Sequence, residues 1–429
     1  MSDYPLVFRV RQKFDDPQVD DVAGEVDAQL SRLSLGDKIK SGQTVAVTVG
    51  SRGITNIRDI TKAIIDHLKR LGADPFIVPA MGSHGGGTAE GQRGIIESYG
   101  MTEEFCGCPI RASMETVVVC QAAEGFPVHF DKLAFNADHV VVCNRIKSHT
   151  MFTGDVESGL MKMMLIGLGK HVGASIYHGV VRDYSFGQIV RSVAAEVLAK
   201  CSIVAGVGVV ENSYCQTGRI EAVAPQELEQ REKAMLVQAK QWSPRLPFRT
   251  ADILLIDQIG KDISGAGMDV NVVGRKHQFH RSADDEYPKI KMIAIRDLSQ
   301  RTQGSAIGIG LAEFCRTRAI EKMDVQKTRL NVLTAGHHAE AMLPMDYETD
   351  EQMLQVMLTQ LGRTAPDDAN LMWICSTREL AEVECSAAYL DEARGRDDLE
   401  MVSDLRPLPF DEGGNLDDER MKLTLAVQH

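Results

Sequence analysis

Long apolar runs are missing from the sequence. No uncharged apolar stretch reaches the roughly 18 residues that a membrane-spanning helix needs, so we expect no transmembrane segment. The opening residues, MSDYPLVFRVRQKFDD, are interrupted at once by arginines and aspartates, which is not the pattern of a signal peptide. The sequence therefore predicts a cytoplasmic protein with no membrane partner.

Excess positive charge and closely spaced cysteines are also lacking. The formal net charge is −13, which argues against non-specific binding to nucleic acid, because such binding needs a basic surface. The nine cysteines are scattered, and most lie in apolar, strand-like runs. This distribution indicates buried, reduced thiols in a cytosolic protein. Cys106 and Cys108 form the only close pair, which is weak evidence for a metal site.

What the sequence does contain is an alternation of strand-like and helix-like segments. The first two buried strands end in the glycine-rich turns VGSRG and MGSHGGG, and each is followed by an amphipathic helical pattern. Such alternation is typical of an α/β fold with a mainly parallel sheet, whose ligands bind at the carboxyl ends of the strands. Arg52 and His84 lie in these two turns, so we expect them to face one crevice.

The length of 429 residues allows two or three domains. The segment SPRLPFRT contains two prolines and is predicted to connect two domains. We place an N-terminal α/β domain at residues 1–245 and a C-terminal α/β domain at 246–429. In the second domain we expect a helix over GIGLAEFCRTRAIEKM, and a strand in VLTAG that ends just before His337 and His338.

The stretch KSHTMFTGDVESGLMKMMLIGLGKHVGASIYH, residues 147–178, combines three histidines with lysines and glycines. Histidine titrates near neutral pH and serves as an acid or base, and its neutral ring binds nickel, zinc or copper. A lysine amine can hold a cofactor covalently, and glycines let the backbone approach a phosphate. The stretch therefore has the parts of a cofactor site, although no single part is specific.

Several segments, taken in order, resemble the nickel-dependent lactate racemase family. SRG resembles the family's Thr-Arg-Pro turn, MGSHGGGTAEG its Gly-x-His-Arg segment, and NRIKSHTMFTG the segment of its second catalytic histidine. GLMK resembles the Gly-Gly-Arg-Lys segment, and a histidine follows its lysine by 16 residues, as in the family. DQIGK resembles a segment of the family's second domain. The matching positions are Arg52, His84, His149, Lys162, His178, Gln258 and Lys261.

The resemblance implies that a nickel-pincer nucleotide, a pyridinium mononucleotide carrying nickel, is the cofactor. Lys162 would tether the nucleotide and His178 would bind the nickel. His84 and His149 would be the acid and base in the inversion of C2 of a 2-hydroxy acid such as lactate, malate or a sugar acid, by hydride transfer to and from the cofactor. Arg52, Gln258 and Lys261 would bind the substrate, and the site would lie in the cleft between the domains.

The resemblance also implies partner proteins that synthesise the cofactor, and a homodimer is compatible with the sequence. Two other functions stay open. One is an NAD(P)-dependent oxidoreductase of a 2-hydroxy acid, although no convincing G-x-G-x-x-G lies between a strand and a helix. The other is a non-catalytic nickel- or cofactor-binding homologue, because leucine and methionine, not a basic residue, precede Lys162.

Overall fold

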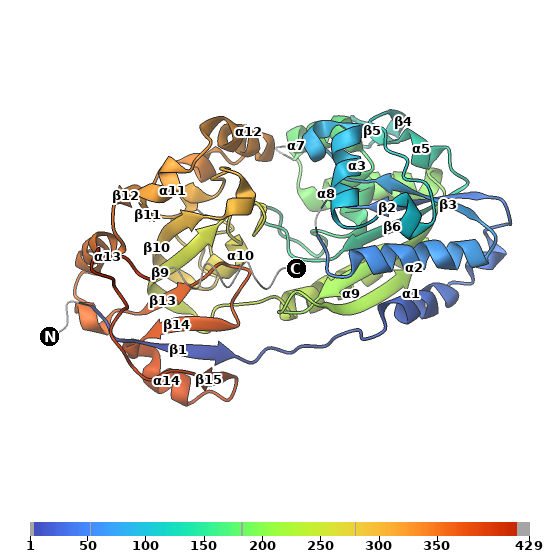
Figure 1. Ribbon diagram of the computed structural model, residues 1–429. Coiled ribbons are helices and arrows are strands. Elements are labelled where there is room, and N and C mark those ends of the chain that lie inside the picture. The colour runs from blue at the N-terminus through green and yellow to red at the C-terminus, as the bar shows by residue number, and fades with distance from the viewer. Residues whose placement is uncertain (1–3, 52, 182, 279, 418–429) are drawn as a thin grey trace. The chain divides into compact units, whose positions relative to one another are not determined.

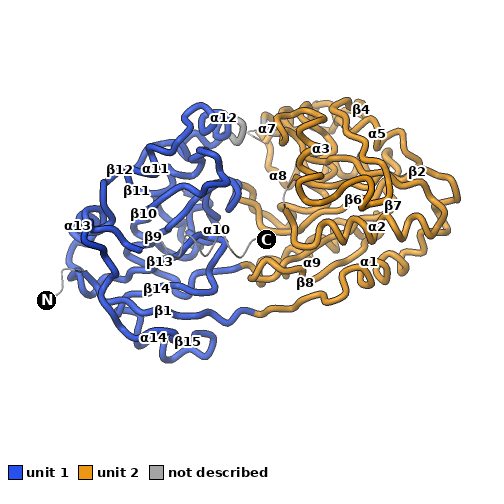
Figure 2. Tube along the Cα trace, viewed as in Figure 1, with its two compact units in different colours: residues 1–14, 244–429 blue, residues 15–243 orange. Residues whose placement is uncertain are grey.

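The chain divides into two compact units, each with its own sheet. A computed structural model describes residues 4–417 except 52, 182 and 279. Unit 1 comprises residues 1–14 and 244–429, and unit 2 comprises residues 15–243 (Figure 2). The sequence-based division placed the first 14 residues in the N-terminal domain, whereas in the structure β1 (Val7–Gln12) pairs with the last strands of the chain.

Unit 2 contains a five-stranded sheet in the order β3-β2-β6-β7-β8. The first four strands are parallel, and β8 runs antiparallel to β7. A separate hairpin pairs two further strands. The strands of this unit are β2 (Thr44–Val49), β3 (Asp74–Pro79), β4 (Thr116–Gln121), β5 (Pro127–Asp131), β6 (His139–Arg145), β7 (Ile203–Glu211) and β8 (Thr217–Val223).

Helices cover both faces of the unit 2 sheet (Figure 1). One core joins the sheet to α1 and α2, and the other joins it to the helical run after residue 159, to α8 and to α9. The strands are nearly continuous in Val, Ile and Ala, as expected for a parallel sheet buried on two sides. The helices are α1 (Val22–Ser31), α2 (Ile57–Arg70), α3 (Ala89–Ser98), α4 (Glu103–Cys106), α5 (Lys132–Phe135), α6 (Leu160–Lys162), α7 (Lys170–Val180), α8 (Phe186–Lys200) and α9 (Leu228–Gln241).

Unit 1 contains an eight-stranded mixed sheet in the order β12-β11-β10-β9-β13-β14-β1-β15. The first five strands in this order are parallel, and the last three are joined by antiparallel pairs. The strands are β9 (Thr250–Ile259), β10 (Lys289–Leu298), β11 (Phe314–Arg316), β12 (Met345–Tyr347), β13 (Leu371–Ile374), β14 (Glu382–Ser386) and β15 (Leu399–Met401). The helices are α10 (Val270–Val273), α11 (Thr317–Glu321), α12 (Val325–Ala335), α13 (Asp350–Thr359) and α14 (Leu390–Arg394). The predicted α/β class with mainly parallel sheets is confirmed.

Two predictions within unit 1 are wrong. The expected helix over residues 308–323 is instead a short 3-10 turn, strand β11 and helix α11. The expected strand in VLTAG is the last part of α12. Short apolar runs do not distinguish a strand from a helix by periodicity, so tertiary pairing decides between them. Among the described residues, no helix is long and apolar enough to cross a membrane.

Candidate functional site

The carboxyl ends of β2, β3 and β6 form one edge of the unit 2 sheet. The chain proceeds from β2 to β3 on one side and returns to β6 on the other, so the strand order reverses between β2 and β6. Ligands of parallel α/β sheets bind at such a reversal, outside the carboxyl ends of the strands. Gly50 follows β2 and contacts the Lys162 helix, because a Cβ added to it would lie 3.2 Å from the Met163 methyl group.

His84 lies at this edge, five residues after β3 ends. Its Nδ1 is 2.9 Å from the carbonyl oxygen of Met81 and 2.9 Å from the hydroxyl of Ser51, which follows β2. Gln92 of α3 donates to the carbonyls of Gly82 and His84 at 2.9 and 3.2 Å. The ring is half-buried and held from two neighbouring strand ends.

Glycines let the helical run that contains Lys162 approach the His84 loop closely. The amide of Gly82 donates to the carbonyl of Gly167 at 3.4 Å. A Cβ at Gly167 would lie 2.4 Å from the sulfur of Met163 and 2.8 Å from the carbonyl oxygen of Ala80. Any larger residue at this position would push the helix away from the loop, so the sequence MMLIGLG is needed for this contact.

A buried lysine fixes the end of β3. Lys170 is fully buried, donates to the carbonyl of Pro79 and lies 2.8 Å from the carboxylate of Asp131. Burial lowers the pKa of Lys170, and the charge of Asp131 opposes that shift. The ammonium group therefore holds the backbone just before the His84 loop.

The loop that carries His149 is closed by a two-residue bridge. Lys147 and Ser158 exchange backbone hydrogen bonds of 2.9 and 3.3 Å. Inside the loop, the buried carboxylate of Glu157 accepts from the amides of His149 and Gly154, at 2.7 and 3.3 Å. Lys240 of α9 lies 2.6 Å from the same carboxylate. This ion pair ties the loop to the body of unit 2.

The His149 ring has a defined position within that loop. Its Nδ1 accepts from the amides of Met151 and Phe152, at 3.0 and 3.2 Å. The ring stacks on Phe152, with centroids 4.4 Å apart, and Phe152 stacks on Phe186 at 4.0 Å. The ring is half-buried. Both its tilt and its hydrogen bonding are thus determined by groups of this unit.

Lys162 is the last residue of α6 and is followed by a π-helical turn over Met163–Gly167. Such turns are rare and are frequent at functional sites. Glu232 of α9 is fully buried and accepts from the amide of Met161 at 2.8 Å, at the start of α6. Burial raises the pKa of Glu232 to about 7, against the hydrogen bonds of the Met161 and Leu160 amides. The carboxyl group of Glu232 therefore caps the short helix α6 and so positions the half-buried Lys162.

Two of the predicted site residues cannot be placed fully. Arg52 lies outside the described residues. His178 belongs to α7, but its side chain is outside the described part of the structure. Ala174, four residues earlier on α7, packs against Gly82, where an added Cβ would be 3.5 Å away. The exposed His171, at the start of α7, lies beside Gly87 of the His84 loop.

The remaining predicted residues, Gln258 and Lys261, belong to unit 1. Gln258 is half-buried near the end of β9, and its backbone amide donates to the carbonyl of Cys375 at 2.9 Å. Lys261 follows β9, and its ammonium donates to Asn331 of α12 at 2.5 Å. Both lie at the carboxyl end of the parallel strands of their own sheet.

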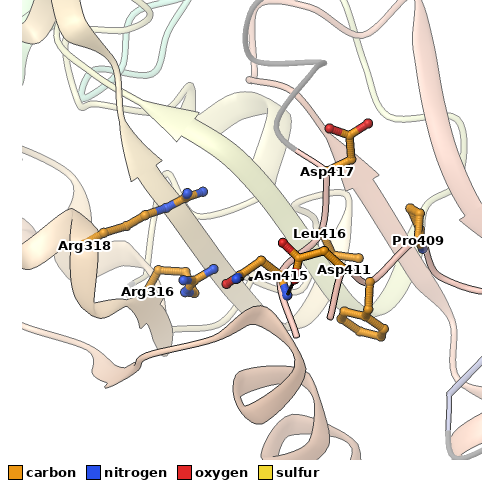
Figure 3. Close-up of a pocket in the computed structure, with 8 residues that line it drawn as sticks. Arg316, Arg318, Pro409, Asp411, Asn415, Leu416 and Asp417 are labelled. Atoms are coloured by element: carbon orange, nitrogen blue, oxygen red, sulfur yellow. Dashed lines mark hydrogen bonds between the residues drawn. The ribbon is translucent and has the colours of Figure 1, made fainter. Parts of the chain in front are cut away.

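Unit 1 also has a cavity of about 510 Å³. It is lined by Arg316, Arg318, Pro409, Phe410, Asp411, Asn415, Leu416 and Asp417, and the two arginines point toward the segment that contains Asn415 and Leu416 (Figure 3). Arg316 is paired with Asp350 at 2.8 Å, and Arg318 lies 3.5 Å from Asp297. Each arginine of this cavity therefore has an acidic partner.

Sequence reasoning missed Glu157, Lys170 and Glu232. A signal existed for Glu232, because it falls in the apolar stripe of α9 with Leu228, Met235 and Leu236, where a charge needs a reason. Glu157 lies in an irregular, glycine-containing loop and Lys170 is the first residue of α7 after a glycine-containing turn, so no periodicity marks either position as buried.

Comparison with known proteins gives one family match and two similar solved structures. The sequence model of the lactate racemase N-terminal domain matches residues 9–185. The lactate racemase apoprotein from Thermoanaerobacterium thermosaccharolyticum is 13% identical, with a TM-score of 0.48, over 87% of this chain and 89% of that chain. A structural-genomics protein from Thermotoga maritima is 12% identical, with a TM-score of 0.45, over 66% of this chain and 71% of that chain. No curated protein matches the chain.

The sheet topology defines an α/β protein whose candidate site lies at the strand-order reversal of unit 2. Residues 9–185 contain the ends of β2, β3 and β6 and the Lys162 segment. Residues 9–185 match the lactate racemase N-terminal domain, and this match supports membership of the lactate racemase family, as the motifs led us to expect.

Proposed function

We propose that the protein is a racemase or epimerase that inverts C2 of a 2-hydroxy acid. The observation that carries the proposal is the meeting of three segments at one sheet edge, inside the region that matches the lactate racemase domain. These segments bear His84, His149 and Lys162, and close glycine contacts and buried charges hold them there.

In this reaction the chain's own side chains bind and orient the substrate and handle its hydroxyl proton. His84 and His149 are the acid/base candidates, since each ring is half-buried and held at the edge. Arg52 would pair with the substrate carboxylate, because a planar guanidinium suits two oxygens. Gln258 and Lys261 would add contacts from unit 1.

The proposed cofactor, a nickel-pincer nucleotide, is consistent with the side chains that the structure describes here. When bound, this cofactor would accept the hydride from C2 and return it. Lys162 offers a half-buried amine on a short, capped helix, which suits a tether, and His178 would supply one nitrogen ligand. Among the described residues, no group of three or more His, Cys, Asp or Glu side chains forms a metal site. Nickel at His178 would take its other ligands from the pincer of the nucleotide.

The test is to produce the protein together with the cofactor's biosynthetic enzymes and to measure its intact mass and nickel content. We expect nickel and a covalent adduct on a peptide that contains Lys162, and neither in a Lys162→Ala variant. A bare, nickel-free chain, under conditions that load a known lactate racemase, would contradict the proposal.

The same preparation separates the other candidate functions. Bound NAD(P) in place of nickel would favour an oxidoreductase. Nickel and adduct without inversion of any 2-hydroxy acid would favour a non-catalytic cofactor-binding homologue, for which the Leu-Met sequence before Lys162 is the motivation.

A further inference from the structure

The two candidate histidines differ in what surrounds the Nδ1 atom of each ring. In a neutral imidazole one nitrogen carries the proton and the other carries the lone pair, and the partner of one nitrogen determines the state of the other. The partners of Nδ1 therefore assign the tautomer of each ring.

For His84, the partner of Nδ1 is the carbonyl oxygen of Met81, at 2.9 Å. A carbonyl oxygen only accepts, so Nδ1 carries the proton. The Ser51 hydroxyl, at 2.9 Å, is compatible with this assignment because a hydroxyl also accepts. The neutral ring then has its lone pair on Nε2, and adding a proton there disturbs neither contact of Nδ1.

For His149, the partners of Nδ1 are the amides of Met151 and Phe152, at 3.0 and 3.2 Å. Backbone amides only donate, so Nδ1 carries the lone pair and Nε2 carries the proton. A proton on Nδ1 would face both amide hydrogens and would break both hydrogen bonds. The stack on Phe152 and the bond from the His149 amide to Glu157 hold the ring and its backbone in this arrangement.

We propose that the two histidines have unlike roles, in which His84 alone exchanges the substrate's hydroxyl proton and His149 stays neutral and donates a hydrogen bond from Nε2. This inference rests on the proposed function and refines it, because two equivalent bases are no longer required. A neutral histidine that polarises a carbonyl oxygen is an established catalytic role.

The chemistry balances with one base. As the O–H bond of the substrate breaks, its proton goes to Nε2 of His84, and the bound cofactor of the proposed function would supply the hydride acceptor and donor for C2. His84 then returns the proton to the oxygen of the inverted product, so no net oxidation would occur. His149 would stabilise the carbonyl oxygen throughout without changing its own protonation.

Glu157 and Lys240 are positioning residues in this scheme. The Glu157 carboxylate bonds the amide of His149 at 2.7 Å, and Lys240 lies 2.6 Å from that carboxylate and donates to the carbonyl of Gly154 at 3.2 Å. Together they shape the turn whose next amides, from Met151 and Phe152, select the His149 tautomer.

The direct test is nitrogen NMR of the full chain labelled with ¹⁵N-histidine, which distinguishes protonated from lone-pair ring nitrogens. Signals are assigned with His84→Gln and His149→Gln variants, and the exposed His277 serves as the reference for an exchanging ring. We expect a proton on Nδ1 of His84 and a proton on Nε2 of neutral His149. A proton on Nδ1 of His149, in a neutral ring or an imidazolium, would overturn the proposal. This readout does not depend on the cofactor, so it stands even if the proposed function fails.

Kinetics of the cofactor-loaded protein give the second test. His149→Gln keeps an N–H donor near the position of Nε2, so we expect racemisation to fall by only about tenfold. His149→Phe keeps the stack but removes the donor. His84→Gln removes the base, and we expect this change to lower the rate of racemisation about 10²–10⁴-fold. Equal, complete losses in His84→Gln and His149→Gln, with adduct and nickel retained, would contradict unlike roles. Absence of racemisation in loaded wild-type protein would instead refute the proposed function.

Discussion

Buried charges are used differently in the two units. In unit 2, three buried charged side chains each bond the backbone of one segment of the candidate site. Lys170 bonds the strand end before His84, Glu157 bonds the loop of His149, and Glu232 bonds the helix of Lys162. In unit 1, buried charges form a network of ion pairs, which also bonds the backbone of Leu416 and Glu348.

The unit 1 network is centred on Arg296. Its guanidinium donates to Asp257 at 2.7 Å and to both oxygens of Asp350, at 3.1 and 2.9 Å. Arg316 lies 2.8 Å from Asp350, and Trp373 donates to Asp257 at 2.6 Å. Burial opposes the ionisation of Asp350, but the hydrogen bonds and charges of Arg296 and Arg316 lower its pKa.

The two units therefore use buried charges, whose desolvation costs free energy, in two different ways. A closed network of opposite charges compensates its own desolvation, so the unit 1 network is a structural element. In unit 2, Lys170 and Glu157 each have an ion-pair partner and also bond the backbone, and a buried charge of this kind is retained where a particular backbone position matters. The placement of such charges therefore marks the candidate site independently of any motif.

The largest effect is expected from Asp350→Ala. This change leaves Arg296 and Arg316 buried without their shared partner, which costs about 3–5 kcal/mol. Chemical denaturation followed by the fluorescence of Trp373, in a Trp242→Phe background, reports unit 1 alone, because each unit contains one of the two tryptophans. The exposed Asp367→Ala is the matched control. If Asp350→Ala and Asp367→Ala lowered the free energy of unfolding by the same small amount, the structural role of the unit 1 charge network would be refuted.

Glu232→Gln tests the second half of the comparison through pH. The folded pKa of about 7 is raised above the ordinary value, so the contribution of Glu232 to stability is complete at low pH and is lost as pH rises through 7. From an ordinary pKa near 4.3, the loss amounts to about 3–4 kcal/mol. We expect the variant to lack this decrease in the free energy of unfolding between about pH 4.5 and 7, and to be more stable than wild type at pH 8.

The measurement is the free energy of unfolding across that range, followed by Trp242 fluorescence in a Trp373→Phe background. Glu227→Gln, at an exposed residue just before the same helix, should leave this pH dependence in place. Parallel curves for wild type and Glu232→Gln would show that this carboxyl group is not the buried titrating group inferred here.

The smallest effect is expected from Thr88→Ala. Thr88 caps α3, just after the glycines of the His84 loop, and its hydroxyl accepts from the amide of Gly91 at 3.1 Å. Loss of such a neutral cap costs about 1 kcal/mol. Thr88→Ser should restore the cap in the same denaturation experiment. A loss as large as that of Asp350→Ala would mean that neutral caps stabilise the structure as strongly as buried charges.

Much of unit 2 could be predicted from the sequence because its elements have clear local signals. The apolar strands bounded by glycine turns, the helical pattern of α2 and the Thr88 cap all correspond to observed elements. The second half of unit 1 could not be predicted, because FCR becomes a strand by pairing with β10 and β12, and VLTA continues a helix that begins after the Asp324 cap.

The candidate site was only partly predictable. Order and spacing of motifs predicted His84, His149 and Lys162 as site residues, and the position of their segments after strand ends predicted that they lie at one edge. The supporting charges and the unlike surroundings of the two histidines depend on loop conformation. Nothing in KSHTMFTG indicates that the amides of Met151 and Phe152 turn back to the ring of His149.

The central claim is inversion at C2, and its most direct test is a chiral assay. Protein loaded with cofactor is incubated with one enantiomer of lactate, malate and representative sugar acids, and both the other isomer and the 2-oxo acid are quantified. The account predicts conversion of at least one acid to the equilibrium mixture of isomers, without release of oxo acid and without added NAD(P). Protein that holds nickel and the Lys162 adduct but leaves every acid unchanged would contradict it.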